Sequence, residues 1–470
     1  MAARRPTRIL GQAPRRSGVM KPNPQTKPAP GRGPGLDEAP RVLLLLPTTT
    51  YKARDFLEAA AELGVEAVVG SDQPQVLESI APGRTLTLPL QDARASAHVI
   101  VEFARFRPLQ AIVPTDDQTA VVAAHAAQAL GLPHNPPDAA RAARRKDLLR
   151  ERLQAAGVRT PRHRLLPADP PPTDAGLMAL AAVQVFPCVL KPLFLSASRG
   201  VIRADSAEQF VAAFRRIQAL LSRPEVTGRG DVEERRFILA EEFVPGPEVA
   251  LEGLLTRGQL RVLALFDKPD PLDGPFFEET LYVTPSRLPP PAQEAIVATA
   301  RAAARALGLA EGPVHAELRL GSDPRPGSEP GPWLIEMAAR SIGGLCARAL
   351  RFGVGITLEE LILMHALRRD VEACVRERRP AGVLMLPIPR AGVLRQVRGI
   401  EAARAVPGVD EVSLTATIGQ PVEPPPEGGA YLGFVFARGA SAGEVETSLR
   451  AAGACIKARI AANDGEETVQ

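Results

Sequence analysis

The sequence has no long apolar run, few aromatic residues and only four cysteines in 470 residues. Its leucine run at 43–46 lies inside RVLLLLP, whereas a transmembrane helix needs about 18 apolar residues. The cysteines form neither a CxxC pair nor a metal-ligand spacing; they are Cys188, Cys346, Cys374 and Cys455. We therefore exclude a helical membrane protein and expect a cytoplasmic protein with reduced thiols and a core of Leu, Val, Ile and Ala.

The body of the chain also lacks an excess of basic residues. The net charge is +4, but residues 1–36 carry eight Lys or Arg and no acidic residue. The remainder therefore holds 49 of the 57 basic residues against all 53 acidic ones, which argues against a nucleic-acid partner. Residues 1–40 are rich in Pro, Gly and Arg, so we expect a disordered basic tail. A transit peptide and translation from Met20 are the alternatives for this segment.

The hydrophobic pattern predicts mixed α/β and α+β architecture in three parts. In residues 41–137, apolar strands alternate with helices, which favours a parallel sheet with crossover helices. In residues 138–375, a helix capped by Asp138 and stopped at Gly157 precedes a strand-rich region. Residues 380–465 alternate Val, Leu and Ile between Gly and Pro, and we expect a small α+β domain there.

Two neighbouring features suggest contacts to phosphate. Lys191 ends a buried strand in VLKP, and the small residues of Leu195–Val201 follow before the next strand. A lysine in that position can place its ammonium against phosphate, and a loop of small residues lets backbone N–H groups approach an anion. The alternatives are a lysine that points to water and an ordinary hairpin turn.

The segment EEFVPGPE at 241–248 joins two predicted strands. Backbone groups near Glu242 and Val244 could pair with an adenine edge, and Glu248 could accept from ribose hydroxyls. A solvated acidic turn is the alternative, and for Glu242 it is the favoured one.

Glu317 and Glu336 lie in two consecutive strand-like runs, HAEL and LIEM. If these strands pair as a hairpin, the carboxylates lie side by side and repel unless a cation sits between them. Mg²⁺ is bound in this way, through few carboxylates plus substrate phosphates. Two unrelated edge glutamates are the alternative. His315 shares a face with Glu317, although a structural strand histidine is the favoured interpretation, and Asp116 and Asp117 are expected to cap a helix.

Taken in order, these motifs resemble the ATP-grasp superfamily over about residues 41–465. The segments DKP at 267–269, FFEET at 276–280, TPS at 284–286 and EMAARSIGG at 336–344 are similar to the branch of bacterial L-amino-acid ligases and carnosine-synthase-like enzymes. This resemblance implies an N-terminal Rossmann-like parallel-sheet domain, a two-lobed ATP-binding core and a small C-terminal domain. A homodimer is compatible with it.

The resemblance also implies roles for individual residues. ATP phosphates would be contacted by Lys146 and Lys191 and covered by a loop with Ser196, Ser198 and Gly200. The adenine and ribose would be held by Glu241, Glu242, Phe243, Val244 and Glu248. Glu317 and Glu336 would bind Mg²⁺ or Mn²⁺, Arg340 would hold the substrate carboxylate, and Lys268 and Glu279 would act on the substrate side, unless they form a surface ion pair.

Two positions depart from the family pattern. Ala338 stands where many ATP-grasp enzymes have an Asn beside the second metal-binding glutamate, and Leu281-Tyr282 stands where dipeptide-forming members can have Gly-His. The resemblance as a whole nevertheless implies an ATP-dependent ligase that activates a small carboxylate, such as an amino acid, and joins it to an amine. An ATP-grasp carboxylase using bicarbonate and a catalytically silent ATP-binding protein are the alternatives.

Overall fold

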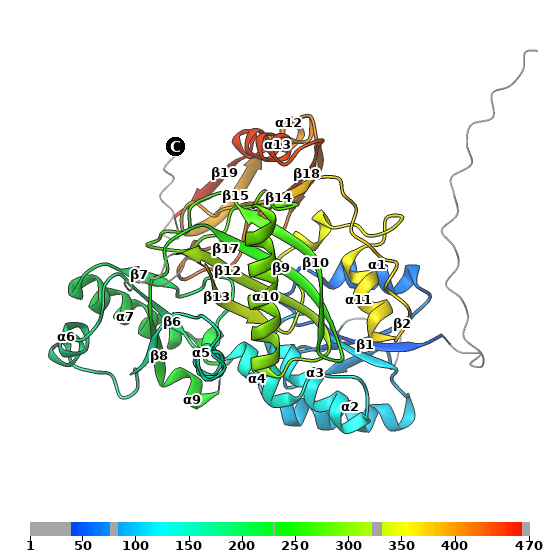
Figure 1. Ribbon diagram of the computed structural model, residues 1–470, viewed down its shortest axis with the longest axis horizontal. Coiled ribbons are helices and arrows are strands. Elements are labelled where there is room, and N and C mark those ends of the chain that lie inside the picture. The colour runs from blue at the N-terminus through cyan, green and yellow to red at the C-terminus, as the bar shows by residue number, and fades with distance from the viewer. Residues whose placement is uncertain (1–38, 76–82, 229–230, 322–330, 463–470) are drawn as a thin grey trace, which may run out of the picture. The chain divides into compact units, whose positions relative to one another are not determined.

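The structure is a computed structural model that describes residues 39–75, 83–228, 231–321 and 331–462 (Figure 1). All of them belong to one unit, Leu36–Gln470. The predicted disordered tail, apart from its last two residues, lies outside the described residues. The predicted boundaries between the three domains stay a prediction.

The N-terminal part forms the expected parallel sheet, in the strand order β3-β2-β1-β4. Its strands are β1 (Arg41–Leu45), β2 (Glu66–Ser71), β3 (Thr85–Thr87) and β4 (Ala111–Pro114), and its helices are α1 (Ala53–Glu62), α2 (Ala93–Phe106) and α3 (Asp117–Leu130). Leu43 and Leu45 are buried on the face covered by α2 and α3, and Leu44 is buried on the other face with α1. Burial on both faces explains why β1 is a continuous apolar run.

The helix expected over 138–157 is two helices, α4 (Pro137–Arg144) and α5 (Lys146–Ala155). The chain leaves helical geometry at Arg145, which has φ −87° and ψ 112°, and the Arg145 guanidinium pairs with Asp147. The expected cap is also wrong, because Pro136 is the N-cap of α4 and Asp138 lies in its first turn. The break places Lys146 at the start of a new helix.

The next part is a smaller lobe built on an antiparallel sheet in the order β5-β8-β6-β7 (Figure 1). Its strands are β5 (His163–Pro167), β6 (Cys188–Pro192), β7 (Ile202–Ala204) and β8 (Phe237–Glu242). Its helices are α6 (Asp174–Ala182), α7 (Ala207–Leu221), α8 (Pro224–Thr227) and α9 (Val232–Arg235). The apolar face of α7 is buried against the sheet through Phe210, Phe214 and Ile217.

The remaining chain forms an antiparallel sheet of eight strands in the order β13-β12-β9-β10-β11-β14-β18-β16. Its members are β9 (Glu248–Thr256), β10 (Gln259–Lys268), β11 (Leu281–Thr284), β12 (Gly312–Gly321), β13 (Gly331–Ala338), β14 (Ala381–Leu386), β16 (Val409–Leu414) and β18 (Gly433–Arg438). The predicted third domain therefore continues the sheet of the second, since β14 pairs with β11.

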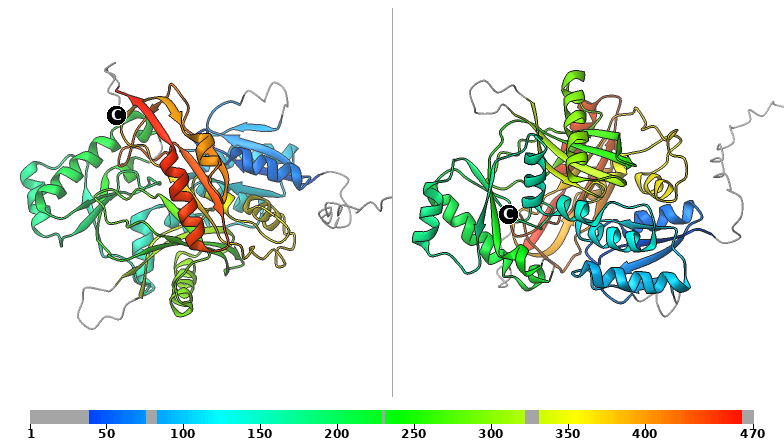
Figure 2. Two further views of the ribbon diagram at one scale, coloured as in Figure 1. Left: turned by 90° about the horizontal axis from the view of Figure 1, so that it is seen from above. Right: turned by 60° about the horizontal axis from the view of Figure 1, so that its bottom comes forward.

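Four α-helices and a small fourth sheet, with three strands, complete the fold (Figure 2). They are α10 (Pro290–Leu307), α11 (Leu358–Ala366), α12 (Ile400–Arg404), α13 (Ala442–Cys455), β15 (Gly392–Arg398), β17 (Pro421–Val422) and β19 (Lys457–Ala461). The apolar face of α10 packs on the large sheet with contacts to β13 and β10, and α13 packs on β14 and β18. Among the described residues, no helix combines the length and apolar character needed to cross a membrane.

Candidate active site

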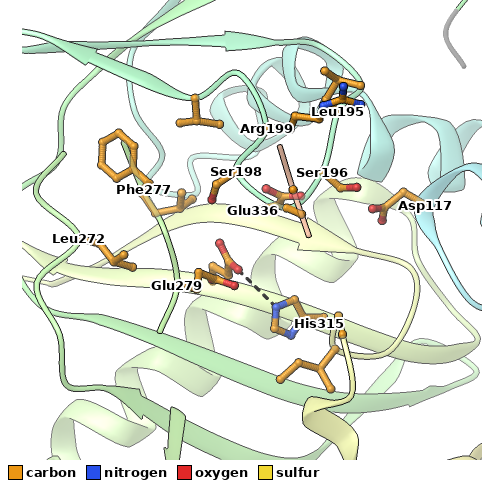
Figure 3. A pocket seen from close by; sticks show the side chains of 18 of the residues that line it. Asp117, Leu195, Ser196, Ser198, Arg199, Leu272, Phe277, Glu279, His315 and Glu336 are labelled. Carbon is orange, nitrogen blue, oxygen red and sulfur yellow. Dashed lines mark hydrogen bonds and ion pairs between the residues drawn. The ribbon is translucent and has the colours of Figure 1, made fainter. Parts of the chain in front are cut away.

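A cavity of about 480 Å³ lies where the parallel sheet, the smaller lobe and the eight-stranded sheet meet. Every residue that the sequence placed in the site lines it, except Gly200 and Lys268. Figure 3 shows Ser196 and Ser198 of the loop after β6 on one side, and on the other side Glu279 of the connection between β10 and β11 and His315 of the large sheet. The cavity has the size and mixed polarity of a small-molecule site.

Lys191 reaches the cavity from β6 and is held by a buried carboxylate. Its Nζ lies 2.6 Å from Glu241, whose other oxygen accepts from Arg150 Nε at 2.8 Å. Burial acts to raise the pKa of Glu241, but Arg150 and Lys191 outweigh it and lower that pKa to about 2. Burial also lowers the pKa of Lys191, an effect that Glu241 opposes. Glu241 thus serves first to orient Lys191.

Lys146 reaches the same region because of the break between α4 and α5. Its backbone N–H donates to Leu193 O at 3.1 Å, and its Nζ donates to Leu195 O at 2.6 Å. The start of α5 is thereby tied to the loop that follows β6. The two lysines approach the cavity from different elements, as a phosphate-binding pair would require.

The loop after β6 has an unusual backbone. Ala197 and Ser198 have φ of 55° and 54°, and Gly200 has φ of 74°. Gly200 does not line the cavity, but a Cβ there would lie 2.6 Å from Pro192 Cγ, so the position requires glycine. Ser196 and Ser198 do line the cavity. Their hydroxyls are therefore available to a ligand, whereas Gly200 acts through packing.

A flat apolar slot lies between the smaller lobe and the large sheet. It is lined by Phe243 and Val244 from the connection after β8 and by Leu272, Phe277 and Ile335. The rings of Phe243 and Phe277 lie 6.4 Å apart, and the Arg203 guanidinium stacks 4.2 Å from the Phe243 ring centre.

Besides Glu241, which pairs with Lys191, two further acidic residues were predicted for this slot, and they differ in their partners. Glu242 also lines the cavity and accepts from Arg162 N at 3.4 Å. Glu248 is less free than expected for a ribose acceptor. Its two oxygens accept from Lys268 at 2.7 Å and from Arg319 at 2.7 Å. A ribose would have to share this carboxylate with both cations.

Lys268 occupies the centre of a group of three carboxylates. Its Nζ contacts Glu279 and lies 2.7 Å from Glu248 and 3.3 Å from Glu317. Burial acts to lower the pKa of Lys268, yet the carboxylates raise it well above its usual value. Lys268 is 6% exposed, so the alternative of a surface ion pair is wrong. The carboxylates of Glu248, Glu279 and Glu317 lie close enough together to hold a metal, but Lys268 already pairs with all three.

Glu317 and Glu336 are directly paired across β12 and β13, as the hairpin hypothesis predicted. A register shift follows immediately, between Glu317 and Leu318. Both carboxylates line the cavity. Cross-strand partners have Cβ atoms about 5 Å apart, near enough for both carboxylates to reach a single Mg²⁺ ion. The donor set of this pair therefore fits a divalent cation.

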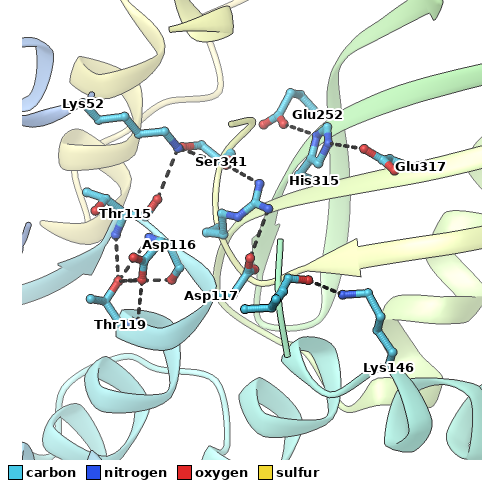
Figure 4. Close-up of polar contacts among 12 residues, drawn as sticks. Lys52, Thr115, Asp116, Asp117, Thr119, Lys146, Glu252, His315, Glu317 and Ser341 are labelled. Carbon is cyan, nitrogen blue, oxygen red and sulfur yellow. Dashed lines mark hydrogen bonds and ion pairs between the residues drawn. The ribbon is translucent and has the colours of Figure 1, made fainter. Parts of the chain in front are cut away.

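His315 is part of a buried chain of charged side chains, whereas the interpretation favoured from the sequence was a structural strand histidine. Its Nδ1 lies 2.8 Å from Glu252 and its Nε2 lies 3.4 Å from Glu317 (Figure 4). Burial acts to lower the pKa of His315, but the two glutamates raise it to about 9. Glu252 was missed, although a glutamate within the apolar strand EVALEGLLT is the same signal that identified Glu336.

Arg340 contacts helix α3 of the N-terminal part. Its Nη2 lies 3.2 Å from Asp117 of α3, and its Nη1 donates to Ser341 O at 3.0 Å. Burial acts to lower the pKa of Arg340, and Asp117 and Glu336 raise it above its usual value. Asp116 caps α3 as predicted, accepting from Thr119 N. The expected capping role of Asp117 is wrong, because Asp117 is the first residue of α3; it lines the cavity and pairs with Arg340.

Lys52 is a second cation on this side that the sequence did not indicate. It is 5% exposed, and its Nζ donates to Thr115 O at 3.3 Å and to Ser341 O and Oγ at 3.1 Å (Figure 4). Burial and the nearby Arg340 lower the pKa of Lys52 to about 8.

Tyrosines form much of the wall beyond Arg340. The chain has three, Tyr51, Tyr282 and Tyr431, and all of them line the cavity. Tyr282 donates to Glu279 at 2.6 Å, and Tyr51 and Tyr431 both pack edge-on against Phe434. No sequence pattern links these residues, because they belong to separate elements.

Known families match most of the described chain. Residues 57–134 match the ATP-grasp N-terminal domain, residues 184–349 the ATP-grasp domain, and residues 384–461 the L-amino acid ligase C-terminal domain 2. The chain belongs to the ATP-grasp family. Family membership, the ATP-grasp fold and the ligase class thus agree with the expectations from the sequence.

Several proteins that are similar to this chain are named as ligases or synthases. The alanine–anticapsin ligase of Bacillus subtilis is 28% identical over 56% of this chain and 55% of its own length. Carnosine synthase 1 of Gallus gallus is 28% identical over 73% of this chain and 38% of its own length. The crystal structure of an L-amino acid ligase from Bacillus licheniformis superposes with a TM-score of 0.74 and 26% identity, covering 90% of this chain and 99% of that one.

Proposed function

We propose that this ATP-grasp ligase phosphorylates a small carboxylate with ATP and transfers the resulting acyl group to an amine. The observation that carries the proposal is the content of one cavity. Two buried lysines and an aromatic slot lie at one end, a cross-strand carboxylate pair lies in the middle, and Arg340 and Lys52 lie at the other end. These are the groups needed for a nucleotide, a divalent cation and a carboxylate.

At the nucleotide end, Lys146 and Lys191 would hold phosphate oxygens, and the hydroxyls of Ser196 and Ser198 would add donors. The adenine would enter between Phe243 and Phe277, with backbone groups of the connection after β8 at its edge. Because Lys191 is already oriented by Glu241 at 2.6 Å, little reorganisation would be needed when phosphate binds.

Glu317 and Glu336 would hold Mg²⁺ or Mn²⁺. The cation would neutralise negative charge on the phosphate oxygens during transfer. His315 would keep Glu317 in place, since the two side chains lie 3.4 Å apart.

The proposed reaction has two steps. In the first step, a carboxylate oxygen attacks the γ-phosphorus of ATP. The bond between the γ-phosphorus and ADP breaks, and an acyl phosphate forms. The amine nitrogen then attacks the acyl carbon, the bond to phosphate breaks, and the nitrogen loses a proton. Arg340 would bind the substrate carboxylate first and then the oxyanion that forms on amine attack, where a guanidinium is well suited.

The substrate end favours a small carboxylate with an uncharged body. Arg340 and Lys52 supply two cations there, while Tyr51, Ile342, Met385 and Tyr431 supply apolar wall. Compact organic acids meet this description, and an amino acid with an uncharged side chain meets it apart from its ammonium group.

The test is ADP release by the full-length protein. Release would be measured with MgATP in three mixtures. The first contains pooled small carboxylates alone, the second contains pooled carboxylates and pooled amines, and the third contains bicarbonate in place of the carboxylates. We expect release that requires both carboxylate and amine, together with a new amide detected by mass spectrometry. Release driven by bicarbonate would favour a carboxylase, and the absence of release in every pool would favour a silent ATP-binding protein.

A further inference from the structure

The loop after β6 is held by a segment of the C-terminal part of the chain. Ala197 and Ser198 are consecutive residues with a Cβ in the left-handed region, a conformation that is costly for both. Such a backbone persists where its surroundings maintain it. The surroundings here are residues 423–429, which lie between β17 and β18.

Three contacts join this segment to the loop. Gly200 N donates to Pro426 O at 2.7 Å, and Arg199 Nε donates to Glu427 O. Gly429 lies against the loop so closely that an added Cβ would be 3.2 Å from the Ala197 Cβ. The loop backbone therefore follows the position of the segment.

Two arginine–glutamate pairs join the same segment to the helices of the smaller lobe. Arg216 of α7 pairs with Glu427 through both of its oxygens, one of them at 2.8 Å from Nη2. Arg223, which follows α7, pairs with Glu423 at 2.7 and 3.0 Å. Burial acts to raise the pKa of Glu427, but Arg216 outweighs it and the pKa is lowered. Bidentate pairs fix geometry as well as charge.

The segment also leads directly into the cavity. Gly429, Ala430 and Tyr431 line it on the substrate side, while Ser196 and Ser198 line it on the nucleotide side. One stretch of about nine residues thus contacts the loop, the smaller lobe and the substrate wall.

We propose that residues 423–429 act as a latch that holds the loop after β6 in its ligand-binding conformation, with Glu423 and Glu427 as positioning residues. The inference rests on the proposed function in assigning ATP phosphates to this loop. The latch would keep Ser196 and Ser198 directed at the nucleotide and the smaller lobe closed over the acyl phosphate. Loss of the latch should therefore weaken ATP binding and admit water.

The first test compares full-length wild type with the double variant Glu423→Gln/Glu427→Gln, which keeps side-chain shape and removes both charges. The control is Glu401→Gln, which removes an exposed pair with Arg404 in the same part of the chain. Loss of one partly exposed ion pair should change the Kd for MgATP roughly two- to five-fold. We expect the double variant to bind MgATP about five- to ten-fold more weakly by calorimetry, at an unchanged melting temperature. ADP release without amine should rise, while kcat at saturating ATP changes less than KM.

The second test asks for recovery by exchange of charges. Arg223→Glu should weaken MgATP binding, and Arg223→Glu/Glu423→Arg should restore most of it. Neither residue lines the cavity, so recovery would reflect the pair itself. A swap no better than the single variant would contradict the role of this pair.

A third measurement separates the latch from the proposed function. Hydrogen exchange of residues 195–200 should be faster in Glu423→Gln/Glu427→Gln than in wild type without any nucleotide. Equal exchange would overturn the latch, whether or not the wild type binds ATP. Faster exchange in a protein that does not bind MgATP would instead uphold the latch and refute the ATP assignment.

Discussion

Replacement of Glu241 by Gln should cost both stability and ATP affinity. The buried carboxylate separates two cations, Arg150 at 2.8 Å and Lys191 at 2.6 Å. The Gln side chain has the same shape but leaves both cations without a counter-ion. Its amide also offers a single acceptor where the carboxylate offered two.

The magnitude follows from the pKa of Glu241, which falls from an ordinary value of 4.5 to about 2. That depression corresponds to about 3 kcal/mol of stabilisation at neutral pH, at about 1.4 kcal/mol for each pKa unit. Breaking a buried ion pair by removing one partner costs about 3–5 kcal/mol, which agrees. We therefore expect Glu241→Gln to lower the free energy of unfolding by about 3 kcal/mol.

The direction of the pH dependence is also set. Because the pKa of Glu241 is depressed in the folded state, its contribution to the free energy of unfolding is complete above pH 4.5. The contribution is lost as the pH falls through about 2. The difference between wild type and Glu241→Gln should therefore be equal at pH 6 and pH 8.

Urea unfolding at both pH values measures the difference, and Glu58→Gln, which removes an exposed pair with Arg54, is the control. A loss below about 1 kcal/mol would refute the idea that Glu241 neutralises both cations, since that is the size of an exposed pair. MgATP titration of the same variant should show weaker binding because Lys191 loses its anchor.

Three further predictions concern the proposed metal-binding pair and the substrate end of the cavity. Arg340→Lys should bind MgATP normally and lose about 2–4 kcal/mol of transition-state stabilisation, which is the contribution of one oxyanion donor. If the melting temperature and the ATP affinity both fall instead, Arg340 forms a structural pair with Asp117. Glu336→Ala should abolish turnover and remove the dependence of ATP binding on Mg²⁺, with retained turnover contradicting the metal assignment. Tyr431→Phe should raise KM for the carboxylate or the amine several-fold while leaving the Kd for ATP unchanged, and a change in ATP affinity alone would move Tyr431 out of the substrate wall.

Local patterns predicted those parts of the fold and site that depend on neighbours in sequence. The apolar run of β1 indicated a strand buried on both faces, and strand periodicity brought Glu317 and Glu336 together through one hairpin. Lys191 and the small-residue loop were found for the same reason, because a strand end and the following turn are contiguous. In each case the distance along the chain is short, so a pattern suffices.

The residue Lys52, and the contact that the predicted Arg340 makes, were missed because both depend on meetings between distant segments. Lys52 meets Ser341, which is 289 residues away, and Arg340 meets Asp117, which is 223 residues away. No periodicity encodes such a meeting. The break at Arg145 was missed because the local pattern is helical throughout, and the contact between Lys146 and the loop after β6 is a tertiary one. Glu252 was the exception, since its place in an apolar strand was visible.

The continuous large sheet restricts how this protein could exchange parts with its relatives. A recombination point at 376–380 looks like a natural seam, yet it separates β11 from β14, which are joined over four residue pairs from Leu281↔Leu384 to Thr284↔Ala381. An incoming segment would also have to place glycine at 382, where a Cβ would lie 2.7 Å from Tyr282 O. Shuffling of whole C-terminal modules would thus break the sheet at the strand that carries Tyr282. New substrate preferences in this lineage should arise by point changes along the cavity wall rather than by domain exchange.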